Sequence, residues 1–532
     1  MQAFLDSIGY NGWVLPALLV IPLLGALAVW AHSRTVTGAT GDALASAEHT
    51  ARMLTLAILI LEFVVSIGLW WSFDPSSSGW QATFDTRWIE SWGARFSLGI
   101  DGLSLMMVLL TTLLMPLAVL GGWTSIARKV HAYHVMMLLL TVGILGVFVA
   151  RDLFLFYVMW EVMLVPMYFI IGIWGGERRI YASLKFFIYT MLGSLLMLVA
   201  IVYLGWQAGM MDGRPNFSFD AIFAIAELRP GVALWLFLAF FVAFAVKVPM
   251  FPLHTWLPDA HVEAPTAGSV ILAGILLKLG TYGFLRLAIP LFPGIALNDT
   301  VRTVILSLSV IGVIYGSLVA LVQPDFKKLV AYSSVAHLGM VMLGLFAMTT
   351  ESVQGAMMVM IGHGISTGAL FFLIGMIYER KHSRLLADYG GIAKVVPIFA
   401  TCLTIVALSS IGLPGTNGFI GEFLVLVGAF QTVPWMATIS AIGVILAAAY
   451  LLWALQRILY NPLDKPSNAT LTDLNWREIG LLAPLLFVII WMGVYPKPIL
   501  SRMEASVAKF VETVETRAAS QQATMSATTG GN

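Results

Sequence analysis

Six ionisable side chains interrupt segments of the chain that are otherwise apolar. They are Glu161, Lys247, Lys278, His337, His363 and Glu422. A charged side chain at the centre of a membrane helix costs roughly 3 kcal/mol, so each of these residues needs a partner or a purpose. Carboxylates, amines and imidazoles all bind and release protons. The set therefore favours proton transfer as its chemistry.

Both lysines, Lys247 and Lys278, lie within apolar segments of the sequence. Lys247 immediately precedes Val248-Pro249, and Lys278 lies near the middle of an apolar segment. An ammonium removed from water releases its proton more readily, and an approaching carboxylate makes it hold that proton again. We predict that Glu161 is this carboxylate. The alternative is that Glu161 and Lys247 form a permanent structural ion pair, or that Glu161 caps a neighbouring helix.

The remaining three residues extend the lysine pair into a path. Glu422 follows the sequence PGTNGFIGE, where loosened backbone admits water to a carboxylate, so we interpret it as the far end of the path. Imidazoles can both accept and donate a proton, so His337 and His363 suit a water-bridged relay between the lysine and this glutamate. The alternatives are a surface position for Glu422 and packing roles for the two histidines.

The composition is that of a membrane protein. Of 532 residues, 59% are hydrophobic and 11% are charged, whereas soluble domains have about 25% charged residues. The single cysteine, Cys402, excludes a disulfide framework and a cysteine-ligated cluster within this chain. A net charge of +1 without a long basic block argues against nucleic acid. There is no Walker loop, dinucleotide-binding glycine motif or nucleophile elbow.

The hydropathy pattern predicts an all-α protein with fourteen membrane spans. They are residues 13–32, 53–71, 101–123, 133–150, 153–174, 180–206, 232–256, 266–287, 301–322, 329–348, 352–378, 395–430, 435–455 and 476–495. The seventh and twelfth are predicted to be broken, at Pro249 and Pro252 and at Pro414, because proline removes a backbone donor and clashes with the preceding turn.

Two broken spans five apart predict two inverted five-helix repeats, spans 4–8 and spans 9–13. The expected parts are residues 1–130, 131–290, 299–460 and 470–532. Loops after odd-numbered spans carry sixteen lysines and arginines, and loops after even-numbered spans carry seven. Because basic loops stay in the cytoplasm, both termini are predicted to face away from it.

Three features stay outside this path. Residues 497–517 alternate charged and apolar residues at helical spacing, which predicts a helix on the membrane surface or against a partner, followed by a disordered end from residue 520. His254, Asp259, His261 and Glu263 lack metal-ligand spacing and are interpreted as helix termini and a polar loop. Glu62 has no evident partner in the sequence.

Three longer segments resemble the antiporter-like subunits of respiratory complex I. They are RDLFLFYVMWEVMLVPM (151–167), KVPMFPLHTWLPDAH (247–261) and AYSSVAH (331–337), within a resemblance that runs from about residue 99 to 495. The glutamate at 422, where related L and N subunits typically have lysine, makes the M branch, the counterpart of mitochondrial subunit 4, the most similar. The absence of a long lateral helix after the last span also disfavours the L branch.

The resemblance implies a proton-translocating subunit of NADH:quinone oxidoreductase in a bacterial inner membrane. Glu161 then pairs with Lys247, Lys278 is the central relay, His337 and His363 extend it, and Glu422 opens toward the far side. Flavin mononucleotide, iron–sulfur clusters and quinone are expected in partner subunits, with none in this chain, and neighbours of the L and N types are expected in the bilayer. The alternatives are a subunit of a sodium/proton antiporter or membrane-bound hydrogenase, and a non-transporting scaffold.

Overall fold

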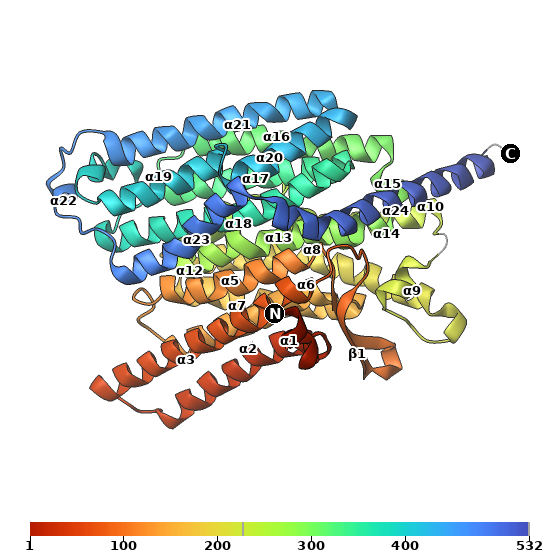
Figure 1. The fold of residues 1–532 in the computed structure, drawn as a ribbon, viewed down its shortest axis with the longest axis horizontal. Coiled ribbons are helices and arrows are strands. Elements are labelled where there is room, and N and C mark those ends of the chain that lie inside the picture. The colour runs from red at the N-terminus through yellow and green to blue at the C-terminus, as the bar shows by residue number, and fades with distance from the viewer. Residues whose placement is uncertain (226–227, 530–532) are drawn as a thin grey trace.

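The computed structural model describes residues 1–225 and 228–529, which form one bundle of roughly parallel helices (Figure 1). Within these residues, twelve helices are long and apolar enough to cross a membrane. Eleven are α2 (Tyr10–Thr35), α3 (Gly41–Ile67, extended to Ser72 by α4, Leu69–Ser72), α6 (Val130–Val149), α7 (Leu153–Trp174), α8 (Arg179–Ala208), α10 (Pro230–Lys247), α16 (Asp299–Leu321), α17 (Phe326–Ala347), α18 (Thr350–Lys381), α21 (Pro434–Leu455) and α23 (Trp476–Val494). The predicted helical membrane fold is thereby confirmed.

The third and twelfth predicted spans are built from shorter helices. Helix α5 (Leu105–Gly121) forms the third, and α19 (Pro397–Ile411) and α20 (Asn417–Thr432) form the twelfth. The latter two are separated at Pro414, as the sequence predicts. The seventh span is also divided, since α10 ends at Lys247 and α11 (Trp256–Glu263) resumes after two prolines. The total of fourteen spans and the inverted repeat stay predictions.

The remaining one of the twelve long helices, Thr266–Leu291, is continuous but irregular. Its segments are α12 (Thr266–Ile271), η3 (Leu272–Leu276), α13 (Leu277–Gly283), η4 (Phe284–Ala288) and α14 (Ile289–Leu291). Both η3 and η4 are π-helical turns, in which hydrogen bonds span five residues and the register of the backbone carbonyls changes. They flank the short segment that carries Lys278.

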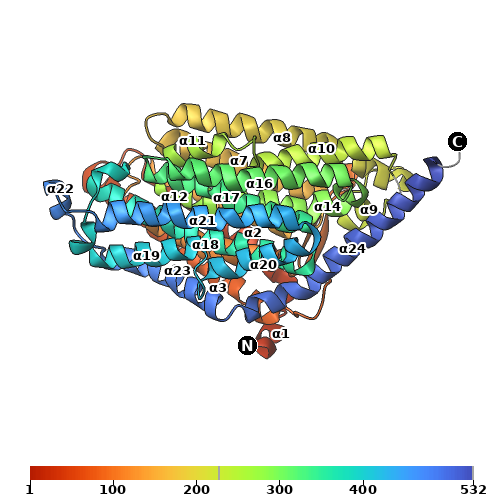
Figure 2. The same ribbon diagram turned by 90° about the horizontal axis from the view of Figure 1, so that it is seen from above.

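The most deeply buried helices are those that carry the central candidate residues. The windows of Thr266–Leu291 and α18 are fully buried inside the protein, and 89% of the α17 window is buried. Helices α8, α21 and α3 lie toward the outside: α21 and α3 lie near opposite edges of the bundle in Figure 1, and α8 lies along one edge in Figure 2. A fully buried helix in a membrane protein does not need to be uniformly apolar, because its side chains meet other helices rather than lipid.

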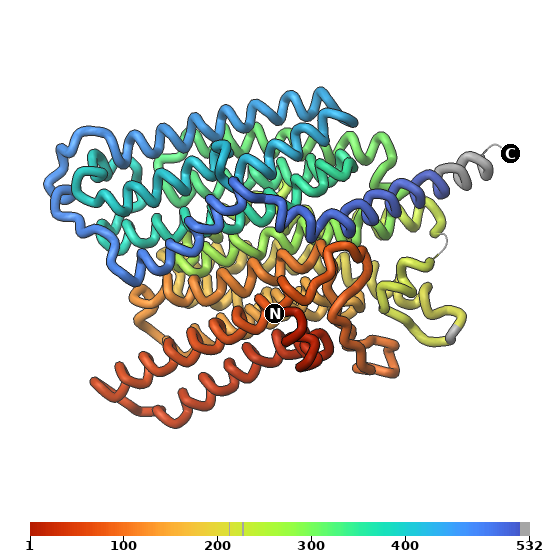
Figure 3. Tube along the Cα trace, in the orientation of Figure 1, coloured from red at the N-terminus to blue at the C-terminus, as the bar shows by residue number. Residues whose placement is uncertain are grey.

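One element was not predicted from the sequence. Strands β1 (Gln81–Ile89) and β2 (Ala94–Ile100) form an antiparallel hairpin that projects at the same end of the bundle as α9 (Phe219–Phe223), as the tube in Figure 3 shows. In the hairpin, the guanidinium of Arg95 binds Asp85 and holds the pKa of that carboxyl below its usual value. The hairpin was missed because the span pattern treats the segment between two apolar runs only as a loop.

The sequence predicts a disordered end from residue 520, whereas the structure describes residues 520–529 as helical. Helix α24 (Lys497–Thr529) continues through this segment, while 530–532 lie outside the described residues. Helix α24 contacts its own chain: Arg502 donates to the Trp70 carbonyl at 3.0 Å, and Ser506 accepts from the Gly102 amide at 2.9 Å. Figures 1 and 2 show it running obliquely across one end of the bundle.

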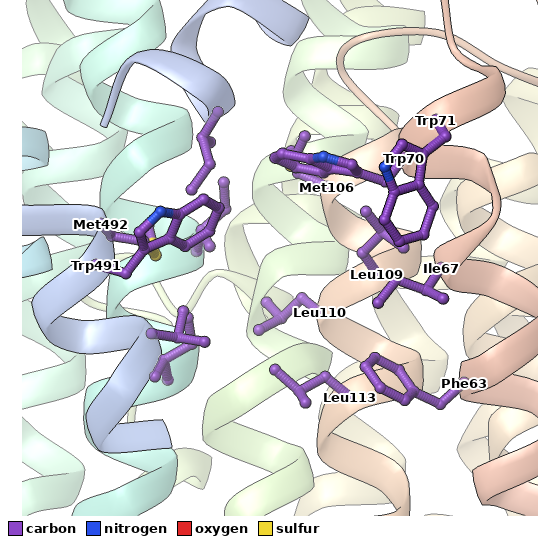
Figure 4. A pocket seen from close by; sticks show the side chains of 14 residues that line it. Phe63, Ile67, Trp70, Trp71, Met106, Leu109, Leu110, Leu113, Trp491 and Met492 are labelled. Atoms are coloured by element: carbon purple, nitrogen blue, oxygen red, sulfur yellow. The ribbon is translucent and has the colours of Figure 1, made fainter. Parts of the chain in front are cut away.

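An apolar cavity of about 310 Å³ lies between α3, α5 and α23 (Figure 4). Phe63 and Trp70 line one side of it and Trp491 lines the other, with 6.0 Å between the ring centroids of the two tryptophans. None of its lining residues is ionisable. The cavity therefore lies apart from the chain of polar residues described below.

A buried ion pair fixes the start of α5 against the irregular helix. Arg286 donates to Asp101 at 2.6 Å, and both side chains are less than 10% exposed. Removing one partner of such a pair leaves an uncompensated buried charge and costs about 3–5 kcal/mol. We therefore expect Asp101→Asn to lower the thermal unfolding temperature of the detergent-solubilised protein markedly. The matched control is Asp85→Asn, whose pair with Arg95 is 40% exposed and is expected to contribute about 1 kcal/mol or less; equal destabilisation by the two variants would contradict this role.

Candidate functional site

Lys278 lies at the centre of the site, with no exposed surface. Its ammonium donates to the Ala273 carbonyl, which lies five residues earlier in the π-helical turn η3. The same ammonium lies 2.6 Å from Nδ1 of His363 on α18. The change of register in η3 thus supplies one partner for the lysine, and the neighbouring buried helix supplies the other.

The contacts continue from His363 to the broken twelfth span. The imidazoles of His363 and His337 have ring centroids 5.4 Å apart, and Nδ1 of His337 lies 3.1 Å from Oε1 of Glu422. All three residues are less than 10% exposed. The structure therefore brings together four of the six predicted residues in one continuous set, contributed by α13, α18, α17 and α20.

Glu422 packs directly against the break in the twelfth span. A Cβ added at Gly412, whose φ is +83°, would meet Oε2 of Glu422 at 2.9 Å. On α20, Asn417 accepts a hydrogen bond from Ser366 on α18 at 3.1 Å and another from Ser409 on α19. These buried polar side chains connect the two halves of the broken span to α18. Asn417 was not predicted from the sequence, because an asparagine beside a glycine-rich break is typical of a turn.

We expect Gly412→Ala to lower proton transport several-fold by displacing the Glu422 carboxylate. The matched control is Gly415→Ala, because Gly415 also has a positive φ, +89°, but a Cβ there would meet nothing within 4 Å. Both substitutions impose the strain of a left-handed residue, roughly 1–2 kcal/mol. Proton uptake by proteoliposomes containing each variant separates the two effects, and an equal loss in both would assign the effect to backbone strain alone.

Glu161 and Lys247 face each other at the other side of the site without closing into a salt bridge. The ammonium of Lys247 acts electrostatically on Glu161, yet no ion pair within 4.0 Å joins them among the described residues. Lys247 has no exposed surface and lies over the rings of Trp160, at 5.6 Å, and Phe186, at 5.1 Å. Aromatic faces attract a cation without accepting its proton. Tyr157 and Ser194 flank the carboxylate.

The lysines of the two regions are connected through backbone packing. A Cβ at Gly280, two residues after Lys278, would meet the backbone nitrogen of Val248 at 2.8 Å. Helix α13 therefore lies directly against the end of α10. In the described part of the chain, no hydrogen bond joins the two ammonium groups, so a proton passing between them requires bridging water.

Two further buried residues, His261 and Lys327, lie in the surroundings of Lys278 and were not predicted from the sequence. His261, interpreted above as part of a polar loop, has no exposed surface, stacks on Phe371 with 4.7 Å between centroids, and acts electrostatically with Lys278 and Lys327. Lys327 was counted with a loop, but it is 8% exposed and donates to the Ala264 carbonyl at 2.6 Å. No pattern in the sequence separates His261 from His254, which stacks on Phe251 instead.

A polar pocket of about 370 Å³ lies at the same end of the helices as Lys327. Its walls include Asp259, Glu263 and Lys328, and Val262, whose carbonyl accepts from Lys327 at 3.4 Å, also lines it. Asp259 forms an ion pair with Lys185 at 2.8 Å. The pocket thus adjoins the backbone around His261.

No group of three or more His, Cys, Asp or Glu side chains in residues 1–225 and 228–529 is placed to hold a metal ion. The chemistry that this arrangement supports is proton transfer between side chains and water. Carboxylates lie at its two ends with ammonium and imidazole groups between them, and burial excludes bulk water from most of its length.

Comparison with known proteins defines the family. Residues 150–448 match the family model described as NADH:quinone oxidoreductase/Mrp antiporter, TM. The chain belongs to this family. Subunit M of the NADH-quinone oxidoreductase from Rhodobacter capsulatus is 46% identical over 503 residues, 93% of this chain and 96% of that protein. Chain 4 of the NADH-ubiquinone oxidoreductase from Arabidopsis thaliana is 45% identical over 87% of this chain and 92% of that one.

Two solved structures share the fold of this family member. A chain of the structure of respiratory complex I from Thermus thermophilus with bound NADH is 32% identical with a TM-score of 0.82, covering 94% of this chain and 99% of that one. A chain of the membrane-bound sulfane sulfur reductase, an archaeal respiratory membrane complex, is 27% identical with a TM-score of 0.75, covering 91% and 76%. The resemblance inferred from the sequence motifs, including the M branch, is confirmed.

Proposed function

We propose that this chain is a proton-translocating membrane subunit of an NADH:quinone oxidoreductase. The observation that carries the proposal is the continuous set of contacts from Lys278 through His363 and His337 to Glu422. The names of relatives that are similar over most of the chain support the assignment to this enzyme complex.

In the proposed mechanism, a change of charge beside Glu161 alters its attraction for the ammonium of Lys247. Because Lys247 is surrounded by aromatic rings and has no hydrogen-bond acceptor in the described structure, this attraction has a large influence on whether it keeps its proton. The proton released passes through water to Lys278. Lys278 then hands a proton to Nδ1 of His363, and the opposite ring nitrogen passes one on toward His337 and Glu422.

The rest of the proposal concerns partners and placement. Flavin mononucleotide, iron–sulfur clusters and the quinone belong to other subunits, and antiporter-like subunits of the L and N types are the neighbours in the bilayer. The membrane is a bacterial inner membrane with both termini on the non-cytoplasmic side, which the distribution of lysine and arginine supports. Residues 131–290 and 299–460 are the two inverted repeats, which the broken helices at Pro249 and Pro414 support.

The proposed function is tested by isolating the chain with its natural partners. Mass spectrometry of subunits that copurify with a tagged chain is expected to identify the remainder of an NADH:quinone oxidoreductase. Proteoliposomes containing that assembly are expected to move protons when NADH and a quinone are supplied. Copurification with subunits of a different enzyme, or NADH oxidation without proton movement, would contradict the proposal.

The second candidate function is that of a subunit of a sodium/proton antiporter or a membrane-bound hydrogenase, both of which are expected to use the same fold. The similarity to a chain of the sulfane sulfur reductase supports it, because this fold also occurs in a different respiratory membrane complex. The lower identity, 27% against 46%, favours the oxidoreductase. The subunits that copurify decide between these assemblies. If the chain is a non-transporting scaffold, a pH jump outside the proteoliposomes is expected to cause no proton movement across their membrane.

A further inference from the structure

Glu62 is a buried carboxylate that the relay described above does not use. It lies on α3 with no exposed surface, and neither of its oxygens has a hydrogen-bond partner within the described residues. An unpaired ionised carboxylate in an apolar surrounding is very costly, whereas a neutral acid is tolerated. The position therefore requires either a proton on the carboxylate or water beside it.

The residues around Glu62 form a polar file along one face of α3. Arg52, Thr55, Glu62 and Ser66 follow at helical spacing and point inward between α2, α5 and α6. Ser66 contacts Thr112 of α5 at 2.7 Å, which fixes one end of the file. Thr55, with no exposed surface, lies two turns from Glu62, a separation of about 10 Å that takes a row of two or more hydrogen-bonded waters to span.

The other end of the file meets a cluster of histidines near the loop between α2 and α3. His134 of α6 is 3% exposed, its Nδ1 has no partner in the described structure, and it acts electrostatically with Arg52. His131 lies one turn earlier on α6, with its ring centroid 5.4 Å from that of His32 on α2. The imidazoles thus connect the buried face of α3 with the surface of the protein.

Among the described residues, no cation opposes Glu62 at its own depth. Helix α5 carries no ionisable residue between Leu105 and Gly121, and the ionisable residues of α2 and α6 within the bundle lie near the ends of α3. At one end, Tyr10 donates to the Val65 carbonyl. At the other lie Arg52, which pairs with Glu48 at 3.9 Å, and the histidines described above. A neutralising ion pair is therefore not the role of this carboxylate in the described structure.

We propose that Glu62 is a second proton-binding site of this chain, separate from the relay, which exchanges its proton with the solvent through Thr55 and the histidines at the loop between α2 and α3. The bound group is a proton on one carboxylate oxygen. It leaves to water that donates onward to His134, and a proton returns by the same path, so the balance of atoms requires no further reactant.

The test is infrared spectroscopy of the intact complex that contains this chain, in the wild type and in Glu62→Gln. At neutral pH, the wild-type spectrum is expected to contain the carbonyl stretching band of a protonated carboxylic acid, which shifts in heavy water and is missing from the variant. Glu351→Gln, which removes an exposed glutamate, is the matched control and is expected to leave the band in place. A band that is unchanged in Glu62→Gln would overturn the proposal.

The proposed route is tested by how fast the carbonyl stretching band of Glu62 shifts after transfer to heavy water. His134→Phe is expected to slow the exchange of the Glu62 band at least tenfold without removing the band, while Glu351→Gln exchanges at the wild-type rate. An exchange rate in His134→Phe equal to that of the wild type would overturn the route. If Glu62→Gln fails to assemble, Glu62→Asp keeps the acid in a shorter side chain, and a band that does not change frequency in this variant would overturn the assignment.

Discussion

Lys278→Met is expected to lower NADH-driven proton uptake by proteoliposomes on the order of a hundredfold, because it removes the only amine in contact with His363 in the described structure. The neighbouring groups cannot replace it: the Ala273 carbonyl only accepts hydrogen bonds, and the imidazole would lose its proton donor. The measurement is the quenching of a pH-sensitive dye while NADH oxidation is followed in the same vesicles.

Lys278→Arg distinguishes proton transfer from a purely structural charge. An arginine keeps the positive charge but does not release its proton at physiological pH, so transport is expected to stay as low as in Lys278→Met. Lys394→Met, at an exposed lysine, is the matched control and is expected to transport at the wild-type rate. Recovery of transport in Lys278→Arg would show that only the charge matters at this position.

Replacing either Glu161 or Lys247 with alanine is expected to abolish proton pumping in the reconstituted complex. The two side chains interact across more than a salt-bridge distance, with the ammonium held over aromatic rings, so each determines the protonation of the other rather than fixing the helices together. Glu90→Ala, in the exposed hairpin, is the matched control. Native electrophoresis of each complex separates loss of pumping from loss of assembly.

A permanent structural ion pair makes a different prediction for the double variant. If the two charges only neutralise each other, removing both together restores most of the function that each single variant loses. If they transfer protons, the double variant stays inactive. Full pumping in both single variants would end the role assigned to this pair.

The sequence predicts the helices well because the bilayer imposes one strong condition, namely about 20 apolar residues per span. The predicted segment 153–174 coincides with α7, and the breaks at Pro249 and Pro414 follow from the missing amide of proline. The hairpin between residues 81 and 100 escaped this reasoning. Its strands lie outside the apolar runs, where hydropathy carries no information about backbone conformation.

The candidate site was predictable where an ionisable residue lies within an apolar stretch of the sequence. Lys278, His337, His363 and Glu422 stand out in apolar surroundings, and the structure joins them. His261 was not predictable, because Asp259 and Glu263 lie two residues from it on either side and only the folded arrangement places it near Lys278. The π-helical turn that presents the Ala273 carbonyl has no sequence signature either, since it depends on how the buried helix packs.

The last helix of the chain has a consequence for the order in which the molecule is completed. Its side chains bind backbone groups of segments made much earlier: Arg502 reaches Trp70, Ser506 reaches Gly102, and Gln521 accepts from the Gly294 amide at 3.0 Å. A ribosome inserting the spans one after another leaves these groups without their partners until the final residues emerge. Translation that stops before residue 497 would therefore release a bundle in which the Trp70 carbonyl and the amides of Gly102 and Gly294 lack these three partners.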